Sequence, residues 1–279
     1  MSPLSINIAR AFLKSPFEFG RWRVEQFIEN WAKANPIRKI VRVAGGVRMF
    51  LDTSDFLQRT LFAAGDFDTH IRQTIQSRLK CGDTFIDIGA NVGFYALCAS
   101  KIVGVSGKVF AFEPAPETMS ALLNNIAING TANIKAAQVA LSDCSGETTL
   151  FLDVANNSGA TSMRETPNAS KAITVMRDSY DNYAREHGVP TPSLVKIDVE
   201  GAECMVLKGM TELLARPDRP AMVIEISELS LKQMGSSKEE LFAIMEKNGY
   251  RAKLLGAPRQ SIYSGASIFF QYDVLFEPV

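Results

Sequence analysis

Thr84-Phe-Ile-Asp-Ile-Gly-Ala-Asn-Val-Gly93 is the stretch of this chain that decides its fold. Its apolar beginning, 84–88, has the composition of a buried β-strand, and small or turn-tolerant residues follow where a strand must bend sharply into a helix. Glycine at such a bend lets a ligand approach the backbone closely. A helical pattern over 94–100 and a second apolar run over 108–112, which ends in Glu113, complete a predicted β-α-β unit.

Charge and spacing indicate which ligand this unit binds. Ligands of β-α-β units bind outside the carboxyl ends of the strands, where Glu113 can accept hydrogen bonds from both ribose hydroxyls of an adenosine. A dinucleotide fold would show G-x-G-x-x-G, whereas Gly89 and Gly93 lie four residues apart with Asn91 between them. Asp87 would repel a diphosphate and suits a cation, such as the sulfonium and ammonium groups of S-adenosylmethionine. We therefore expect these five residues to bind S-adenosylmethionine.

Strands and helices alternate along the rest of the chain, which predicts a mostly parallel sheet covered on both faces. At the carboxyl end of the third strand, Ser142 and Asp143 are expected to meet the adenine edge. The short final connection predicts a hairpin, and hence one antiparallel strand. The expected elements are a helix over 117–129, strands near 133–141 and over 146–153, a polar loop over 156–163, a strand and helix over 173–186, a strand over 194–199, a helix to about 215, a strand over 221–227, a helix over 237–248, a strand after 249 and a closing strand in 267–276.

Residues 1–50 are expected to form a helical and hairpin appendage to an α/β domain over 51–279. Apolar residues at helical spacing fill 5–35, a hairpin is predicted over 38–51, and 52–79 are helical again. Residues 1–48 hold nine Lys or Arg against three Asp or Glu, which leaves 30 − 9 = 21 against 30 − 3 = 27 for the rest. Because the basic residues are scattered, a solvated helix face is favoured over a nucleic-acid or membrane surface.

Composition narrows the class of protein further. The chain of 279 residues is 46% hydrophobic and can bury a large core, yet it has no apolar run of about 18 residues and no leader pattern. A cytoplasmic protein without a transmembrane segment is expected, with homo-oligomerisation left open. Four single cysteines and two histidines in separate elements argue against a zinc site or a disulfide framework.

Several blocks, in order, resemble the FkbM family of S-adenosylmethionine-dependent methyltransferases. They lie at 82–95, 112–114, 139–143 and, most specifically, 195–203 with its continuation to 225, so the resemblance covers about 50–250. It implies a Rossmann-like class I methyltransferase fold with a seven-stranded sheet. It also implies O-methylation of a hydroxyl on a small-molecule natural product, sugar or glycolipid.

A hydroxyl acceptor needs a route for its proton. Alternation places Lys196, Asp198 and Glu200 on one side of the fourth main strand, so Asp198 and Glu200 are candidates for the general base or for orienting the acceptor, with Lys196 tuning their charge. Glu225 is the reserve candidate. For Glu200 and Glu203 the alternative is capping of the next helix. No histidine lies nearby, so no essential metal is expected.

Two other functions stay open. A non-catalytic protein that binds an adenosyl ligand would have the same cofactor residues, whereas the spacing over 87–93 disfavours a nicotinamide-dependent oxidoreductase. No Asn-Pro-Pro-Tyr element follows the fourth main strand, which disfavours methylation of exocyclic amines in nucleic acid. The expected partner is therefore a small-molecule or glycan hydroxyl.

Overall fold

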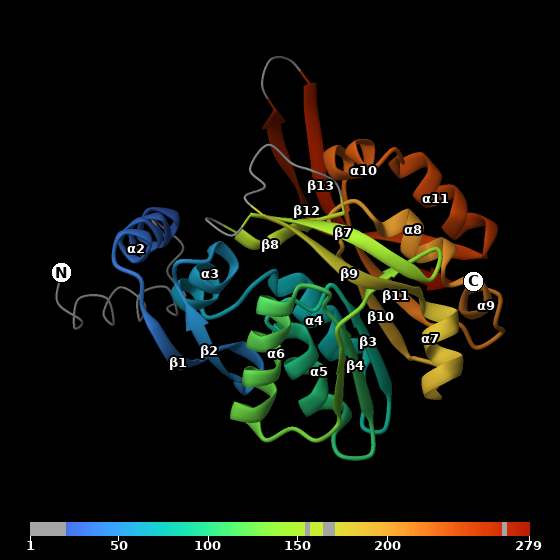
Figure 1. The fold of residues 1–279 in the computed structure, drawn as a ribbon, viewed down its shortest axis with the longest axis horizontal. Helices are drawn as coiled ribbons and strands as arrows, with labels where there is room; N and C mark the ends of the chain where they lie inside the picture. The colour runs from blue at the N-terminus through green and yellow to red at the C-terminus, as the bar shows by residue number, and fades with distance from the viewer. Residues whose placement is uncertain (1–20, 154–156, 164–170, 264–266) are drawn as a thin grey trace.

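The computed structural model describes residues 21–153, 157–163, 171–263 and 267–279 (Figure 1). Its centre is a seven-stranded sheet in the order β12-β13-β11-β10-β3-β4-β5. β13 is antiparallel to both of its neighbours, and the other neighbouring strands run parallel. The predicted Rossmann-like sheet with one antiparallel strand is therefore confirmed. The strands are β3 (Thr84–Ile88), β4 (Lys108–Phe112), β5 (Ile134–Ala137), β10 (Leu194–Ile197), β11 (Ala221–Ser227), β12 (Tyr250–Tyr263) and β13 (Ser267–Pro278).

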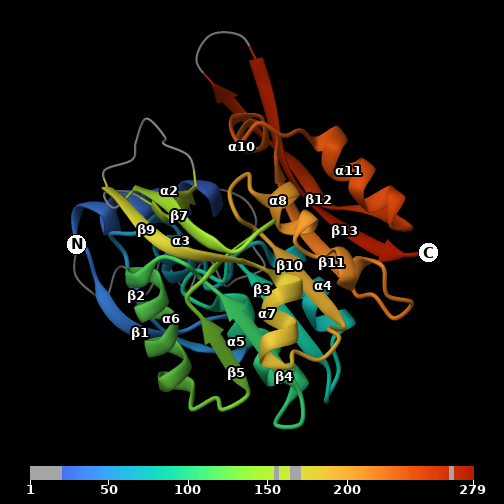
Figure 2. The ribbon, with the colours of Figure 1, turned by 45° about the vertical axis from the view of Figure 1, so that its right-hand side comes forward.

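Helices cover both faces of this sheet (Figure 2). On one face α4 (Thr69–Arg78), α5 (Phe94–Val103) and α6 (Pro116–Asn129) bury a cluster that includes Phe85 and Leu194. The opposite face, which includes Ile86 and Val195, packs against a second group of helices. Side chains alternate between the faces of a strand, so Asp87, Lys196 and Glu225 all belong to the face of α4 and α5. The second group is α7 (Tyr180–His187), α8 (Glu203–Lys208), α9 (Thr211–Leu214), α10 (Glu228–Gln233) and α11 (Lys238–Lys247).

A second sheet, in the order β6-β9-β7-β8, lies beside the first (Figures 1 and 2). It consists of β6 (Ala140–Ser142), β7 (Gly146–Asp153), β8 (Asn157–Ser162) and β9 (Lys171–Ser179). The predicted loop over 156–163 was wrong for 157–162, which pair with β7 as an edge strand, and Asn156 lies outside the described residues. β8 is an edge strand, and edge strands commonly carry polar residues. It therefore lacks the alternation of apolar and polar residues by which strands are recognised.

The expected third strand near 133–141 is divided between the two sheets. Its first part is β5, at the edge of the central sheet, and its last residues begin β6, which pairs in parallel with β9. The break at 138–139 therefore moves the chain from the central sheet to the second sheet. The sequence of this segment contains no turn signal at 138–139, so the break could not be predicted.

The N-terminal part of the described chain contains the predicted hairpin, which packs on the central sheet's helices. α2 (Arg21–Ala34) ends just before Pro36, and β1 (Arg38–Arg42) pairs with β2 (Arg48–Asp52) around a 3-10 turn at Ala44–Gly46. Residues 5–20 of the expected helical segment lie outside the described residues. The side chains of Val47, Met49 and Leu51 are fully buried in the cluster shared with α5 and α6.

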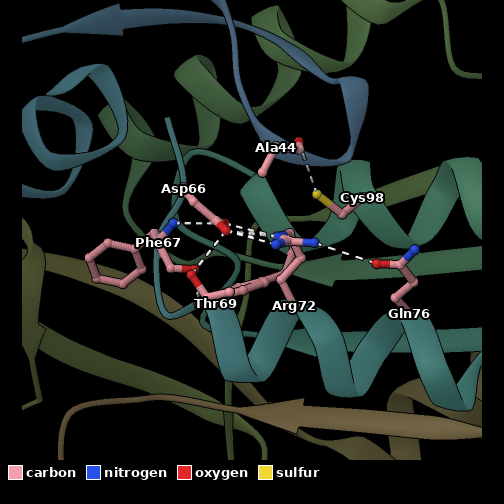
Figure 3. Close-up of polar contacts among 8 residues, drawn as sticks. Ala44, Asp66, Phe67, Thr69, Arg72, Gln76 and Cys98 are labelled. Carbon is pink, nitrogen blue, oxygen red and sulfur yellow. Dashed lines mark hydrogen bonds and ion pairs between the residues drawn. The ribbon is translucent and has the colours of Figure 1, made fainter. Parts of the chain in front are cut away.

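The turn before α4 is held by one ion pair. Gly65, in the left-handed conformation, ends α3 (Phe56–Ala64), and the Asp66 carboxylate then accepts hydrogen bonds from Thr69 Oγ1 at 3.0 Å and from Arg72 Nη2 at 2.8 Å (Figure 3). The predicted helical segment over 52–79 is thus two helices. Phe67, whose backbone amide donates a hydrogen bond to Asp66 Oδ1 at 3.0 Å, lines the cavity described below. None of the helices in the described ranges is long and apolar enough to span a bilayer.

Candidate active site

A cavity of about 580 Å³ lies where β3, β4, β10 and β11 end. The residues that follow these strands form its floor, and Leu141 of β6 and Leu150 of β7 contribute a wall from the second sheet. Carboxyl ends of parallel strands are where ligands bind in open α/β folds. The other lining residues are Phe56, Leu57, Phe67, Ile88, Gly89, Ala90, Asn91, Val92, Phe94, Tyr95, Phe112, Glu113, Pro114, Val139, Ala140, Met163, Lys196, Asp198, Val199, Glu200, Glu225, Ser227, Leu229, Ser230 and Gln271.

The glycine turn after β3 admits no side chain at its first glycine. Gly89 has φ +77°, and a Cβ placed there would lie 1.8 Å from the backbone oxygen of Asp198. Gly93 has φ +90° and precedes α5, and a Cβ there would lie 2.3 Å from Leu122 Cδ1. The turn therefore brings its backbone against the end of β10, and it leaves the amides of Asn91 and its neighbours facing the end of β4.

Glu113 is tied to this turn. Its Oε2 accepts a hydrogen bond from the Asn91 amide at 2.9 Å and its Oε1 accepts one from the Ala115 amide at 3.0 Å. Burial raises the pKa of Glu113 to about 7, although the two amides lower it. Each carboxylate oxygen can accept more than one hydrogen bond. Glu113 can therefore take two further donors, as the two hydroxyls of a ribose would require.

Lys196 is buried between two carboxylates. Its Nζ lies 3.0 Å from Asp198 Oδ2 and 3.8 Å from Asp87 Oδ1. The strand register explains this, since Asp87 on β3 and Lys196 on β10 are cross-strand partners. Burial lowers the pKa of Lys196, but Asp198 and Asp87 together raise it, so the ammonium keeps its charge.

Asp87 lies beneath the cavity, and it is absent from the lining residues that the structure describes. It is fully buried, and burial raises its pKa to about 6 against the opposing effect of Lys196. The sequence predicted a direct role in binding the cofactor. In the structure Asp87 Oδ1 lies 3.8 Å from Nζ of Lys196, which lines the cavity, and the turn that follows β3 lines it as well.

The predicted catalytic residues come together at the other end of the cavity. Asp198, Glu200 and Glu225 all line it, and Gln271 Nε2 donates a hydrogen bond to Glu225 Oε1 at 2.6 Å. Burial, with Asp198 and then Glu200 as further causes, holds the pKa of Glu225 well above its usual range. Glu200 has φ +52°, which is uncommon for a residue with a side chain and is a form of strain that clusters at functional sites.

Ser142 and Asp143 are not brought to the cavity. Ser142 is fully buried, and its backbone oxygen lies so close to Gly209 that a Cβ there would be 1.9 Å away. Asp143 is exposed. Because β6 belongs to the second sheet, the residues of this segment that line the cavity are Val139, Ala140 and Leu141.

Glu203 supports the turn that carries Glu200. Its Oε1 accepts hydrogen bonds from the amides of Gly201 at 3.0 Å and Val199 at 3.3 Å, and it is buried at the start of α8. These contacts match the alternative of helix capping. Among the residues that the structure describes, no three His, Cys, Asp or Glu side chains meet in a way that could hold a metal ion.

We expect Glu203 to make stability depend on pH. Burial raises its pKa to about 7, above the ordinary value of 4.5, so the folded state binds this proton more tightly than the unfolded state does. The stabilisation is fully present below about pH 4.5 and is lost as pH rises through about 7. Urea unfolding at several pH values should show this slope, and Glu203→Gln, which mimics the protonated form, should reduce it. An unchanged slope in the variant would contradict the assignment.

Sequence reasoning passed over several lining residues. Tyr95 lies inside the strand-turn-helix block, and its buried hydroxyl lies 3.4 Å from the backbone oxygen of Phe67. Gln271 on β13 lies opposite Ser227 of β11. A signal for Gln271 existed, because Gln271 and Asp273 are polar residues in a strand that is otherwise mostly apolar, such as over 274–276.

Fold and cavity together define the class of protein: a Rossmann-like methyltransferase, with a glycine turn after the first central strand and an acid at the end of the next. The chain belongs to the family described as "Methyltransferase FkbM domain", whose model matches residues 87–252, more than half of the sequence. Methyltransferases of this class take their methyl group from S-adenosylmethionine. The residues fit that donor, since Glu113 can accept from a ribose and the carboxylates at the other end suit a cation.

Curated relatives are all named methyltransferases. Hexuronic acid methyltransferase AglP of Haloferax volcanii is 32% identical over 133 residues, 47% of this chain and 52% of that protein. Methyltransferase sdnD of Sordaria araneosa is 29% identical over 165 residues, 49% of this chain and 63% of that protein. This chain therefore spans roughly half to two thirds of these relatives. 31-O-demethyl-FK506 methyltransferase FkbM of Streptomyces tacrolimicus is 25% identical over 244 residues, 77% of this chain and 87% of that protein.

Among solved structures, the chain is similar to precorrin-6y C5,15-methyltransferase from Geobacter metallireducens. The TM-score is 0.47 at 13% identity, and the match covers 75% of this chain and 88% of that one. It is also similar to an S-adenosylmethionine-dependent O-methyltransferase from Thermotoga maritima, with a TM-score of 0.45 at 12% identity, over 86% of this chain and 77% of that one.

Proposed function

We propose that the protein methylates a hydroxyl oxygen of a small-molecule natural product, sugar or glycolipid. The observation that carries this proposal is one cavity lined by Glu113, which follows β4, and by Asp198, Glu200 and Glu225, which lie at the ends of β10 and β11, two and three strands away. Glu113 and the turn from Gly89 to Gly93 bind the adenosine. The acidic end faces the sulfonium and the acceptor.

The acidic end favours a hydroxyl over a carboxylate as acceptor. Three carboxyl groups line it against one ammonium, that of Lys196, so an anionic acceptor would be repelled there. A hydroxyl is neutral and loses a proton during transfer, for which Asp198 supplies an acceptor within the cavity. The Streptomyces relative is named for 31-O-demethyl-FK506, which agrees with a hydroxyl acceptor. AglP is named for a hexuronic acid, which carries a carboxylate as well as hydroxyl groups, so that name does not distinguish the two acceptors.

Asp198 is the proposed general base, and Glu200 is proposed to orient the acceptor. Methyl transfer is an in-line displacement at a sulfonium carbon, so the protein aligns the acceptor oxygen, excludes water and removes the proton. Lys196 holds the Asp198 carboxylate by the 3.0 Å ion pair. Phe67, Phe112 and Tyr95 supply the apolar lining that excludes water.

A transfer assay tests this function. The protein is incubated with S-adenosylmethionine labelled in its methyl group and with a panel of hydroxylated metabolites, uronic acid glycans and glycolipids. We expect label in a product that survives mild alkali, as an ether does. Alkali-labile label would identify a carboxylate acceptor, and donor binding without transfer to any member of the panel would favour the non-catalytic alternative.

Glu113→Gln should weaken donor binding. The amide keeps one acceptor oxygen but places an NH2 group against the backbone amide of Asn91 or Ala115, and one ribose hydroxyl loses its acceptor. A hydrogen bond to a charged group contributes about 1.5–3 kcal/mol, so we expect affinity for S-adenosylhomocysteine to fall roughly 10-fold to 100-fold by calorimetry. Glu117→Gln, on the exposed start of α6, is the matched control. Equal affinities in the two variants would remove Glu113 from the site.

Asp198→Asn should slow methyl transfer while donor binding is retained. The amide has nearly the shape of the carboxylate but cannot accept the proton of the acceptor hydroxyl. General base catalysis contributes about 10²–10⁴-fold, so a fall in kcat of that size is expected in the transfer assay. Full activity in this variant would exclude Asp198 as the base.

A further inference from the structure

Two carboxyl side chains of the cavity, Asp198 and Glu225, lie near each other, and Asp198 is the largest cause after burial that raises the pKa of Glu225. Two ionised carboxylates repel in such a site, so the pair favours the state in which one of the two carries a proton. Gln271 Nε2 donates to the other side of Glu225, at 2.6 Å from Oε1. The pair therefore holds one proton when no other cation is beside it.

The surroundings of the pair explain why it keeps this proton. Carboxyl groups outnumber cations at this end of the cavity, and the positive partners are Lys196 and, when it is protonated, His70, whose Nε2 lies 2.6 Å from Asp273 Oδ2. Glu225 and Asp273 are cross-strand partners on β11 and β13. The titratable groups that interact with one or both members of the pair are Asp87, Tyr95, Lys196, Glu200 and Asp273. Asp68 faces Tyr95, and His70 pairs with Asp273.

The donor's sulfonium belongs at the same place. With the ribose at Glu113, on the end of β4, the sulfur follows on the 5′ carbon of that ribose. Neighbouring strands lie about 4.8 Å apart. In the order β4-β3-β10-β11, the ends of β3 and β10 are therefore within reach of the sulfur of a donor whose ribose is at Glu113. Asp198 follows β10. A cation bound there lies beside the Asp198–Glu225 pair.

We propose that the Asp198–Glu225 pair exchanges its proton for the donor's sulfonium and takes a proton back from the acceptor. This inference rests on the proposed function. On transfer, the acceptor oxygen bonds to the methyl carbon, the carbon–sulfur bond breaks with its electron pair left on sulfur, and the hydroxyl proton passes to the pair. The charge at this end of the cavity is the same before binding, with donor bound and after transfer.

The exchange makes the base depend on the donor. Asp198 and Glu225 are both ionised only while a sulfonium is beside them, so the pair is ready to accept a proton only in the complex that can transfer a methyl group. S-adenosylhomocysteine has a neutral sulfur and leaves the proton in place. The same two residues therefore distinguish donor from product by charge.

Calorimetry in two buffers tests the exchange without any acceptor. S-adenosylmethionine and S-adenosylhomocysteine are each titrated into the protein at about pH 6.5, where the amino groups of both ligands are protonated. Phosphate and imidazole both buffer at this pH and differ in ionisation enthalpy, so the difference in heat counts the protons released. We expect the donor to release close to one proton more than the product. Any proton that Glu113 or Asp87 releases on binding is released with both ligands, so it cancels in the difference between them.

Variants identify the source of the proton. Glu225→Gln should bind both ligands and release equal numbers of protons, whereas Glu240→Gln, in an exposed ion pair with Lys208, should keep the difference. Asp198→Asn is the second variant if Glu225→Gln does not fold. Equal proton release by the wild-type protein, with both ligands bound, would overturn the exchange alone. Absence of binding would overturn the proposed function as well.

Discussion

Gly89→Ala should cost the protein roughly 3–5 kcal/mol of unfolding free energy and abolish binding of the donor. A Cβ at this position would lie 1.8 Å from the backbone oxygen of Asp198, and the φ of +77° is unfavourable for alanine. The obstructing atom is backbone, at the end of a central strand, so the clash is relieved only by moving β10 away from β3. Urea denaturation and calorimetry with S-adenosylhomocysteine measure the two effects.

Gly130→Ala is the matched control for this substitution. Gly130 has φ +62° and ends α6, but a Cβ there has no atom within 4 Å. It therefore isolates the cost of the left-handed conformation, about 1–2 kcal/mol, and should leave donor binding unchanged. If Gly89→Ala loses no more stability than Gly130→Ala, the close approach of the turn to β10 is not a constraint.

Lys196→Met should also destabilise the protein strongly, by about 3–5 kcal/mol. Lys196 is 2% exposed and is the cation between Asp87 and Asp198. Removing one partner of a buried ion pair leaves the carboxylates uncompensated in a medium that solvates them poorly. Because burial already raises the pKa of Asp87 to about 6, the loss should be smaller at low pH, where that carboxylate takes a proton.

Two further variants distinguish the loss of the buried Lys196 ion pairs from a general effect of removing a charge. Lys171→Met breaks an exposed ion pair with Glu117, at 3.1 Å, and should cost at most about 1 kcal/mol. The double variant Asp87→Asn/Lys196→Met removes the more deeply buried of the two uncompensated carboxylates and should recover part of the stability. A loss for Lys196→Met as small as that for Lys171→Met would contradict the role of Lys196.

Local patterns were sufficient to predict the central sheet. The apolar runs at 84–88 and 108–112, with Gly89 and Glu113 after them, specify both the strands and the edge where ligands bind, because strand ends in a parallel sheet lie together. Alternation along a strand over 194–199 predicted that Lys196, Asp198 and Glu200 lie on one side, but β10 ends at Ile197. Asp198 and Glu200 therefore reach the cavity from the turn after the strand. The structure places all three at the cavity.

The second sheet could not be predicted, and this explains why Ser142 and Asp143 do not line the cavity as expected. Pairing between β6 and β9 joins segments far apart in the chain, and no local pattern records such pairing. The break after β5 turns Ser142 into the second sheet, against Gly209. Asp87 illustrates a different limit, since its position in the motif is clear while its depth below the cavity depends on packing with Lys196.

Isothermal titration of the purified protein with S-adenosylmethionine, S-adenosylhomocysteine and NAD is the most direct test that this cavity is an adenosyl site of a methyltransferase. We expect both adenosyl ligands to bind and NAD to give no heat of binding, with affinity reduced in Glu113→Gln and unchanged in Glu117→Gln. Binding of NAD alone, or no binding of either adenosyl ligand, would contradict the account.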